Sequence, residues 1–445
     1  MYALANLESH RFGRGDSVYV TEIARTAVGL AAISTDNALS LLDPARLTAG
    51  PIATWTAAHG ASVTALRVLD GGLACTAGED GTVAVWDLRM KGAAARVAQF
   101  KASEAPILSM ACNKDTNTIA VGTELQNHMA SIHLWDVGAA PTAKAHYQDV
   151  HSDDVTQLAF HAAQPALLLS GSTDGLVSVH DTRVADEDEV TVQTFNHGAS
   201  IHRAAFLAPS SEVLALSHDE RFALYDAAEE TPSGDATRDF GDLRPRLGCQ
   251  YVADVTPKTD GVGAVMGAGS QDQQLFQLFF LAKDAEQKWE IDTANSVGLP
   301  GAHGEEIVRS FCFFDQEQVV FTAGEDGCRL VIVALAARPL QLLDLVIVEP
   351  PPDCVLELAP ANLGERLFLL GRLELWLEAR LHADAQRRGK GDGVGVAAYL
   401  VVARRSPRSS ILYRKKRIAQ SLHLKRTRRV GGGDEAKGFE GRDGF

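Results

Sequence analysis

Cysteines are few in this 445-residue chain and lie far apart. Six occur, at positions 75, 112, 249, 312, 328 and 354, and none forms a C-x-x-C pair. This spacing excludes the common zinc and dithiol motifs, and isolated cysteines in apolar segments behave as small hydrophobes. We therefore expect reduced thiols, a reducing compartment and no bound metal.

Long apolar runs are also absent. No stretch of 18 apolar residues occurs, and the first residues, MYALANLESHRFGRGD, lack the apolar centre of a signal peptide. Both observations argue against membrane insertion and secretion. We expect a soluble intracellular protein without a membrane partner.

Glycine motifs that bind nucleotides are also absent. The glycines of Gly261–Gly263 and Gly267–Gly269 do not follow a strand and open a helix with G-x-G-x-x-G spacing. Without that context such glycines indicate strand ends and turns. We predict no cofactor and no small-molecule substrate.

The stretch 151–181 has the pattern of a three-stranded antiparallel meander. Polar and apolar residues alternate over Val155–Phe160, and the turn Ser172–Gly175 separates two further apolar segments, Leu167–Ser170 and Leu176–His180. Short alternating segments joined by Gly and Asp turns are typical of hairpin-linked strands. One such meander is marginally stable alone, so the pattern predicts packing against copies of itself.

The pattern recurs along the chain. Its copies end at aspartates 87, 136, 181 and 226, which lie 49, 45 and 45 residues apart. A histidine before the first strand, a turn with glycine and a Trp-Asp ending at this period indicate WD40 propeller blades. Weaker copies span Val18–Asp43 and Leu247–Leu281. We predict an all-β, seven-bladed WD40 β-propeller over residues 3–335 and a basic, irregular C-terminal extension over 336–445.

A ring of blades leaves an unpaired strand edge unless its ends meet. Ala3–Arg11 is the segment before the first copy that can supply a strand. We predict that this segment completes the last blade and closes the ring.

Histidine, hydroxyl and aspartate residues recur at fixed positions of the copies. In WD40 repeats such residues form a buried network, which matters because an unpaired buried polar group costs about 1–3 kcal/mol. The predicted networks are His59, Thr76, Asp80 and Trp86; His151, Ser170, Asp174 and His180; and His303, Thr322 and Asp326, with Ile332 at the tryptophan position. A catalytic triad occurs once, whereas this set repeats, so we predict no catalytic residue.

Acidic residues gather in loops that a WD40 ring presents on one face. The loop before the first strand of a blade and the turn between its second and third strands open on that face. These loops carry Glu79, Asp153, Asp154, Glu305, Glu306 and Glu325. A negative rim favours a basic peptide or tail as partner over nucleic acid, with a merely solvated surface as the alternative.

Basic residues gather near the C-terminus. Residues 351–445 contain 19 Lys and Arg against 11 Asp and Glu, whereas residues 1–350 contain 23 against 46. Arg404–Arg429 has eleven Lys and Arg and no acid. Such clusters indicate nuclear import or nucleic-acid contact, with a solvated tail as the alternative. The candidate import residues are Arg414, Lys415, Lys416, Arg417, Lys425, Arg426, Arg428 and Arg429.

Two shorter features suggest partner contacts. Leu367–Leu381 has apolar residues at helical spacing and predicts an amphipathic helix, although Gly371 weakens the pattern. Trp86–Arg89 matches the W-D-x-R ending of some propellers that bind ubiquitin ligases, and an arginine there can also cap a strand.

The chain resembles the eukaryotic WD repeat-containing protein 89 family. The resemblance is carried by VGTE at 121–124, HSDDVTQLAFH at 151–161, SGSTDGLVSVHD at 170–181, SHDE at 217–220, and IVRSFC with TAGEDG within 307–327. It spans about residues 3–330 and implies a seven-bladed propeller without catalytic activity and with a scaffold role. Family members tend to end soon after the last blade, and this chain continues beyond it.

These observations together predict a non-catalytic scaffold for protein–protein interaction in nucleus and cytoplasm. One alternative is a nuclear assembly factor, in ribosome biogenesis or chromatin, that contacts nucleic acid through the basic tail. Another is a substrate adaptor of a cullin-type ubiquitin ligase.

Overall fold

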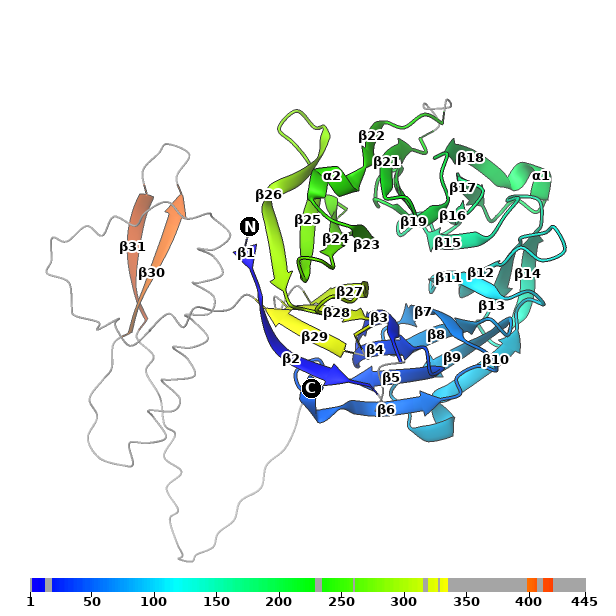
Figure 1. Ribbon diagram of the computed structural model, residues 1–445, viewed down its shortest axis with the longest axis horizontal. Helices are drawn as coiled ribbons and strands as arrows, with labels where there is room; N and C mark the ends of the chain where they lie inside the picture. Colours follow the sequence, from blue (N-terminus) through cyan, green and yellow to red (C-terminus); the bar gives the residue numbers. More distant parts are fainter. Residues whose placement is uncertain are drawn as a thin grey trace, which may run out of the picture. The chain divides into compact units, whose positions relative to one another are not determined.

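The computed structural model of the chain describes residues 2–12, 18–228, 234–258, 261–314, 319–326, 329–334, 398–405 and 411–418. The chain divides into two compact units, Met1–Leu342 and Leu343–Phe445. The described strands of the first unit form six four-stranded sheets and one five-stranded sheet. Figure 1 shows them side by side around a ring, and they are numbered sheet 1 to sheet 7 in the order of their innermost strands.

Sheets 1 to 5 are antiparallel meanders of four consecutive strands each. Their strands are β3 (Val20–Thr26), β4 (Gly29–Ser34), β5 (Ala38–Leu42), β6 (Pro51–Thr56); β7 (Val63–Asp70), β8 (Leu73–Gly78), β9 (Thr82–Asp87), β10 (Arg96–Lys101); β11 (Ile107–Asn113), β12 (Thr118–Thr123), β13 (Ile132–Asp136), β14 (Thr142–Tyr147); β15 (Val155–Phe160), β16 (Leu167–Ser172), β17 (Leu176–Asp181), β18 (Thr191–Asn196); and β19 (Ile201–Phe206), β20 (Glu212–Ser217), β21 (Arg221–Asp226), β22 (Arg238–Asp242). Short helices lie in their connections: η1 (Leu47–Ala49), η2 (Gly92–Ala95), α1 (Glu187–Val190) and α2 (Leu243–Leu247).

Sheets 6 and 7 both use strands from the N-terminus. Sheet 6 contains β23 (Tyr251–Pro257), β24 (Gly263–Ser270), β25 (Leu275–Lys283) and β26 (Trp289–Pro300), and β1 (Tyr2–Ala3) adds to β26 in parallel. Sheet 7 contains β27 (Val308–Phe314), β28 (Val319–Gly324) and β29 (Arg329–Ala334), and β2 (Ala5–Arg11) pairs with β29 antiparallel. The predicted closure is therefore confirmed for Ala5–Arg11, while Ala3 belongs to the neighbouring sheet.

The prediction of a seven-bladed propeller needs a correction. Six sheets are regular four-stranded blades, and sheet 6 differs because its long outer strand β26 also pairs with β1. Opposite Phe279 of β25, four residues of β26 (293–296) lie outside the register. The sequence repeat did not reveal this, because the fifth strand comes from the far end of the chain.

Bulges occur at the same two places in the regular blades. Every innermost strand has a register shift near its start, such as Val155/Gln157 of β15. The shift follows the first residue of the strand in six sheets and the second residue, Val252, in β23. Each outermost strand of the regular blades skips one residue, namely Leu7, Ile52, Val97, Lys144, Val192 and Phe240. Because a bulge twists an edge strand and disrupts its pairing pattern, it discourages addition of a foreign strand.

The core lies between neighbouring sheets. Between sheets 1 and 2, for example, Ile33 and Leu39 pack with Trp55, Leu66 and Trp86, all of them buried. Middle strands such as β4 and β12 are buried along their whole length, because each sheet is covered on both sides by its neighbours. A propeller therefore has a chain of inter-sheet cores in place of one centre.

The described residues of the second unit form the two-stranded sheet of β30 (Ala398–Arg405) and β31 (Ile411–Ile418). These strands cover 398–405 and 411–418 of the predicted extension, and its other residues lie outside the described ones. The predicted helix 367–381 lies outside the described residues. Among the described helices of the chain, none has the length and apolar character needed to span a bilayer.

Candidate functional site

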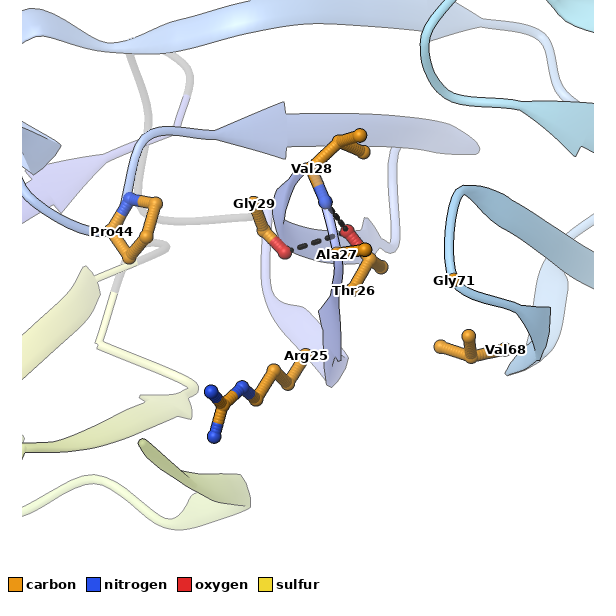
Figure 2. A pocket seen from close by; sticks show the side chains of 8 residues that line it. All are labelled: Arg25, Thr26, Ala27, Val28, Gly29, Pro44, Val68 and Gly71. Atoms are coloured by element: carbon orange, nitrogen blue, oxygen red, sulfur yellow. Dashed lines mark hydrogen bonds between the residues drawn. The ribbon is translucent and has the colours of Figure 1, made fainter. Parts of the chain in front are cut away.

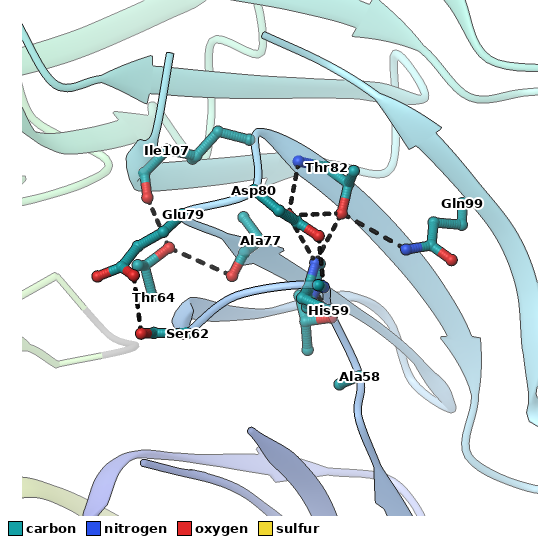
Figure 3. Close-up of polar contacts among 12 residues, drawn as sticks. Ala58, His59, Ser62, Thr64, Ala77, Glu79, Asp80, Thr82, Gln99 and Ile107 are labelled. Atoms are coloured by element: carbon teal, nitrogen blue, oxygen red, sulfur yellow. Dashed lines mark hydrogen bonds and ion pairs between the residues drawn. The ribbon is translucent and has the colours of Figure 1, made fainter. Parts of the chain in front are cut away.

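Sheet 2 contains a buried chain of hydrogen bonds that begins at a tryptophan. Trp86 donates its indole N–H to Thr76 Oγ1 at 2.8 Å, and His59 Nε2 lies 2.8 Å from the same hydroxyl. On the other side of the imidazole, His59 Nδ1 lies 2.8 Å from Thr82 Oγ1 and 3.4 Å from Asp80 Oδ1 (Figure 3). Thr82 donates its hydroxyl to Asp80 at 2.8 Å and so bridges the predicted His59–Asp80 contact. Thr82 was not among the residues predicted for this network.

Asp80 is held in its charged form by the surrounding backbone. The N–H of Gly60 donates to Asp80 Oδ2 at 2.6 Å, and that of Thr82 to Oδ1 at 3.0 Å. Burial alone raises the pKa of Asp80, but the hydrogen bonds from Gly60 and Thr82 and the nearby His59 lower it below its usual value. Burial lowers the pKa of His59 despite Asp80. The network therefore joins a neutral imidazole to a carboxylate.

Sheet 4 contains a longer version of this network. His151 Nδ1 lies 3.0 Å from Asp174 Oδ2, and His151 Nε2 lies 2.6 Å from Ser170 Oγ. The same hydroxyl lies 2.7 Å from Nε2 of His180, which replaces the tryptophan. Nδ1 of His180 lies 3.0 Å from Thr191 Oγ1 on the outermost strand. The structure thus brings all four predicted residues together and adds Thr191.

The network of sheet 7 is shorter. His303 Nδ1 lies 2.8 Å from Asp326 Oδ1, and His303 Nε2 lies 2.9 Å from Thr322 Oγ1. The strand register places Val333, not Ile332, at the tryptophan position. Thr322 pairs with Val331, nine positions further along the chain, whereas Thr76 of sheet 2 pairs with Ala84, eight positions further along. The position predicted from the sequence spacing is therefore one residue too early.

The histidines of these networks are closed off from solvent. The side chains of His59 and His151 are 0% exposed, and that of His303 is 1% exposed. A triad that attacks a substrate needs its hydroxyl and imidazole at a surface. The imidazoles of these networks are therefore not open to a substrate from solvent.

The described sheets share a backbone hydrogen bond at one end of their innermost strands. In six of them, the residue after the second strand donates its N–H to the residue before the first strand at 2.9 to 3.0 Å. The donors are Thr35, Glu79, Glu124, Thr173, His218 and Glu325. The predicted Glu79 and Glu325 therefore occupy equivalent positions around the ring, and Asp154 accepts one of these bonds. Glu124 occupies the same position and was missed, because its turn lacks the Asp-Gly signature.

These loops define one surface, called here the acidic face. Strand direction alternates in a meander, so the loops before the first strands and the turns between second and third strands open on the same side. The acidic face comprises Glu79, Glu124, Asp153, Asp154, Glu305, Glu306 and Glu325. Four of them, Glu79, Glu124, Glu305 and Glu306, are exposed, and the other three are half-buried.

The carboxylates of the acidic face differ in their partners. Glu79 accepts from Ser62 Oγ at 2.8 Å, and Glu325 accepts from Arg309 Nε at 2.6 Å. Asp154 Oδ1 accepts the backbone N–H of Leu125 at 2.7 Å. Within the described parts of the chain, Arg309 is the basic side chain that forms an ion pair with this surface. The negative charge is therefore only partly compensated.

The opposite side of the ring has a hollow of about 570 Å³ beside the turn between β3 and β4. Figure 2 shows the lining residues Arg25, Thr26, Ala27, Val28, Gly29, Pro44, Val68 and Gly71. Ala27 N–H donates to the Gly71 carbonyl at 2.7 Å and thereby joins sheets 1 and 2. The lining has no carboxylate, so this hollow is chemically distinct from the acidic face.

The W-D-x-R arginine has a partner within its own turn. Arg89 donates from Nε and Nη2 to the two carboxylate oxygens of Asp87, both at 2.8 Å. Arg183 with Asp181 and Arg244 with Asp242 repeat this arrangement. The recurrence gives the motif a structural explanation as a turn closed by an ion pair.

The candidate import residues lie partly in β31. Arg414, Lys415, Lys416 and Arg417 pair with Val402, Val401, Leu400 and Tyr399 of β30, respectively. Lys425, Arg426, Arg428 and Arg429 lie outside the described residues.

Comparison with known proteins agrees with the fold. The family described as WD domain, G-beta repeat matches residues 50–87 and 144–181, which end at the third strands of sheets 2 and 4. A chain in the crystal structure of the mitotic checkpoint complex superposes with a TM-score of 0.56 at 16% identity, covering 74% of this chain and 91% of that one. At this identity the likeness concerns the fold alone.

Three relatives extend the match. An uncharacterized WD repeat-containing protein of Schizosaccharomyces pombe is 34% identical over 58% of this chain and 78% of its own length. An uncharacterized WD repeat-containing protein of Saccharomyces cerevisiae is 32% identical over 55% of this chain and 60% of its own length. The WD repeat-containing protein 89 homolog of Dictyostelium discoideum is 25% identical over 54% of this chain and 62% of its own length. The chain therefore belongs to the WD40-repeat proteins, among relatives that include the WD repeat-containing protein 89 homolog.

Proposed function

We propose that the chain is a non-catalytic scaffold whose acidic face binds basic segments of partner proteins. The observation that carries this proposal is the placement of Glu79, Glu124 and Glu325 at equivalent positions around one end of the ring. Carboxylates that converge on one surface raise the local concentration of cationic partners and steer their approach. The WD40 fold supports a platform role, because it presents many short loops on a rigid frame.

Charge reversal of the acidic face tests this proposal. We expect Glu79→Lys, Asp154→Lys and Glu325→Lys together to lower the yield of co-purified basic partners by at least about tenfold, since like charges replace attractive ones. The matched control reverses Asp115, Asp188 and Glu189, which are exposed residues of connections on the opposite side, the last two in α1. Retention of every partner by the acidic-face variant would refute the proposal.

A second candidate function uses the basic tail. The density of cations in Arg404–Arg429 supports nuclear import, and it supports nucleic-acid contact in an assembly factor as a further role. Deletion of 404–429 in a tagged protein should remove the nuclear signal, and salt-sensitive RNA or DNA binding should disappear with it. An unchanged nuclear signal and unchanged binding would rule out both roles.

The ubiquitin-ligase alternative depends on Arg89. Its ion pair with Asp87 and the recurrence of that pair at Arg183 favour a structural role. Co-purification of a cullin complex that is lost in Arg89→Ala and kept in Arg183→Ala would favour the adaptor.

A further inference from the structure

The turn between β12 and β13 differs from the compact turns of its neighbours. Three residues separate the second and third strands in sheets 2 and 4, whereas eight, 124–131, separate them in sheet 3. Within this turn, Gln126 and Met129 exchange two backbone hydrogen bonds of 2.9 and 3.1 Å. The turn is therefore a small hairpin, called here the sheet 3 hairpin, on the acidic face.

The sheet 3 hairpin is held in one conformation at its tip. Asn127 and His128 both have positive φ, 55° and 66°, as the two central residues of a type I′ turn do. Asparagine tolerates this conformation better than most residues, because its short side chain can bond locally.

The base of the hairpin is tied to both adjacent loops. Glu124 N–H donates to the Pro106 carbonyl at 2.9 Å, and Leu125 N–H donates to Asp154 Oδ1 at 2.7 Å. A surface fixed in this way loses little conformational entropy when a partner binds, which favours affinity.

The hairpin combines exposed apolar side chains with nearby carboxylates. All residues from Glu124 to Met129 are exposed, with Leu125 at 37% and Met129 at 47%. Within the described ranges, no basic side chain forms an ion pair with Glu124, Asp153 or Asp154. A partner that covers this place must therefore bring both apolar surface and positive charge.

We propose that the sheet 3 hairpin is the docking site for a Lys- or Arg-rich peptide segment that carries an apolar side chain beside its basic residues. This inference rests on the proposed function and names the partner chemistry. The apolar side chain packs on Met129 or on Leu125, which lie on opposite faces of the hairpin because Met129 pairs with Gln126. The cations face Glu124, Asp153 and Asp154. Methionine suits this role, because its unbranched side chain adapts to different partners.

Two synthetic peptides with the same number of lysines separate the two contributions. One has leucine between its lysines, and the other has serine at the same positions. Burial of one leucine side chain corresponds to about tenfold in affinity. Fluorescence anisotropy at low salt should therefore give a dissociation constant about tenfold lower for the leucine peptide with the full chain.

Two substitutions in the hairpin test the assignment. Met129→Ser and Leu125→Ser together should reduce the ratio of the dissociation constants of the serine and leucine peptides to about one. The affinity for the serine peptide should stay unchanged. The matched control, Ile52→Ser with Val97→Ser, alters exposed side chains (54% and 55%) on outermost strands and should keep the ratio. Circular dichroism of each variant checks that the fold is retained.

The outcomes distinguish this inference from the proposed function. Equal affinity of the unmodified protein for the two peptides overturns the hairpin assignment and leaves the acidic face as a binding surface. Loss of the ratio in the Ile52 and Val97 control also overturns it, because general surface hydrophobicity would then explain the preference. Failure of both peptides to bind overturns the proposed function and the inference together.

Discussion

At the residue scale, the sheet 4 network has one consistent direction of donation. Asp174 can only accept, so His151 donates from Nδ1 and accepts at Nε2 from the Ser170 hydroxyl. Ser170 then accepts from His180 Nε2–H, and His180 Nδ1 accepts from Thr191. Burial holds His180 neutral by lowering its pKa to about 3. Every polar atom along this path has a partner.

Ser170→Ala removes the hydroxyl at the centre of the path. It leaves the buried imidazoles of His151 and His180 each without one partner, which should cost about 1–3 kcal/mol of unfolding free energy. Urea denaturation measures the loss. Ser178→Ala is the control, since the exposed residue Thr194 that loses its 3.1 Å contact can bond to water. Equal losses in the two variants would contradict the assigned role of Ser170.

Glu220 occupies a position that favours glycine. It has φ of 62° in the turn after β20, where the equivalent turns of sheets 2 and 4 have Gly81 at 71° and Gly175 at 83°. One of its carboxylate oxygens is buried without a hydrogen-bond partner among the described residues. Burial raises the pKa of Glu220 to about 7, although the Val252 backbone amide lowers it in part. This residue therefore destabilises its own turn.

Glu220→Gly should raise stability, and more so at pH 8 than at pH 5. Relief of the left-handed backbone contributes about 1 kcal/mol at any pH. Glu220 titrates near 4.5 when unfolded and about 7 when folded, so the folded state binds more protons in this window and stability falls as the pH rises. Glu220→Gln removes the pH-dependent part alone. Equal gains for Glu220→Gly at both pH values, measured by urea denaturation, would contradict the titration.

At the element scale, the N-terminal segment joins two sheets. β1 pairs with Val297 and Gly298 of β26, Leu4 N–H donates to the Gly298 carbonyl at 2.8 Å, and β2 pairs along β29. Without these strands, β29 has an unpaired edge, which is a template for association with other chains. The closure therefore protects solubility as well as stability.

Deletion of residues 2–11 should lower the thermal midpoint and promote aggregation, because sheet 7 loses its outermost strand. Deletion of residues 2–3 removes only the short β1 and should have a smaller effect. Light scattering during thermal unfolding measures both quantities. An unchanged midpoint after the larger deletion would show that β2 contributes nothing to closure.

At the scale of the whole molecule, buried histidines make stability depend on pH. Burial and the stacked neighbour His146, with ring centroids 4.0 Å apart, lower the pKa of His133 to about 4, and burial lowers that of His180 to about 3. Unfolded imidazoles titrate near 6.5. As the pH falls from 6.5 towards 4, the unfolded chain binds more protons than the folded one, so folding stability is lost.

The urea midpoint should therefore be lower at pH 5 than at pH 7.5. His133→Gln should reduce this difference, since it removes one imidazole that must stay neutral in the folded state. Glu220 acts in the opposite direction, so the comparison is cleanest in a Glu220→Gln background. A midpoint that is equal or higher at pH 5 would contradict the prediction.

The repeated residues of the sequence determine the blades and their buried networks. His151, Ser170 and Asp174 lie together because each is fixed by the local geometry of a meander. The spacing of residues along the chain determines that geometry. The period of the repeat then implies a ring, since each meander must bury both of its faces.

Tertiary structure alone decided the features that depend on distant segments. The fifth strand of sheet 6 comes from Tyr2 and Ala3, almost three hundred residues from their partners Val297 and Gly298. In sheet 7 the pairing of β28 with β29 is shifted by one residue relative to sheet 2, so Val333 and not Ile332 takes the position of the tryptophan. Glu124 joined the acidic face through the ring position of its backbone, which no local motif encodes. Spacing along the chain specifies contacts within a blade, whereas contacts between blades follow from closure of the ring.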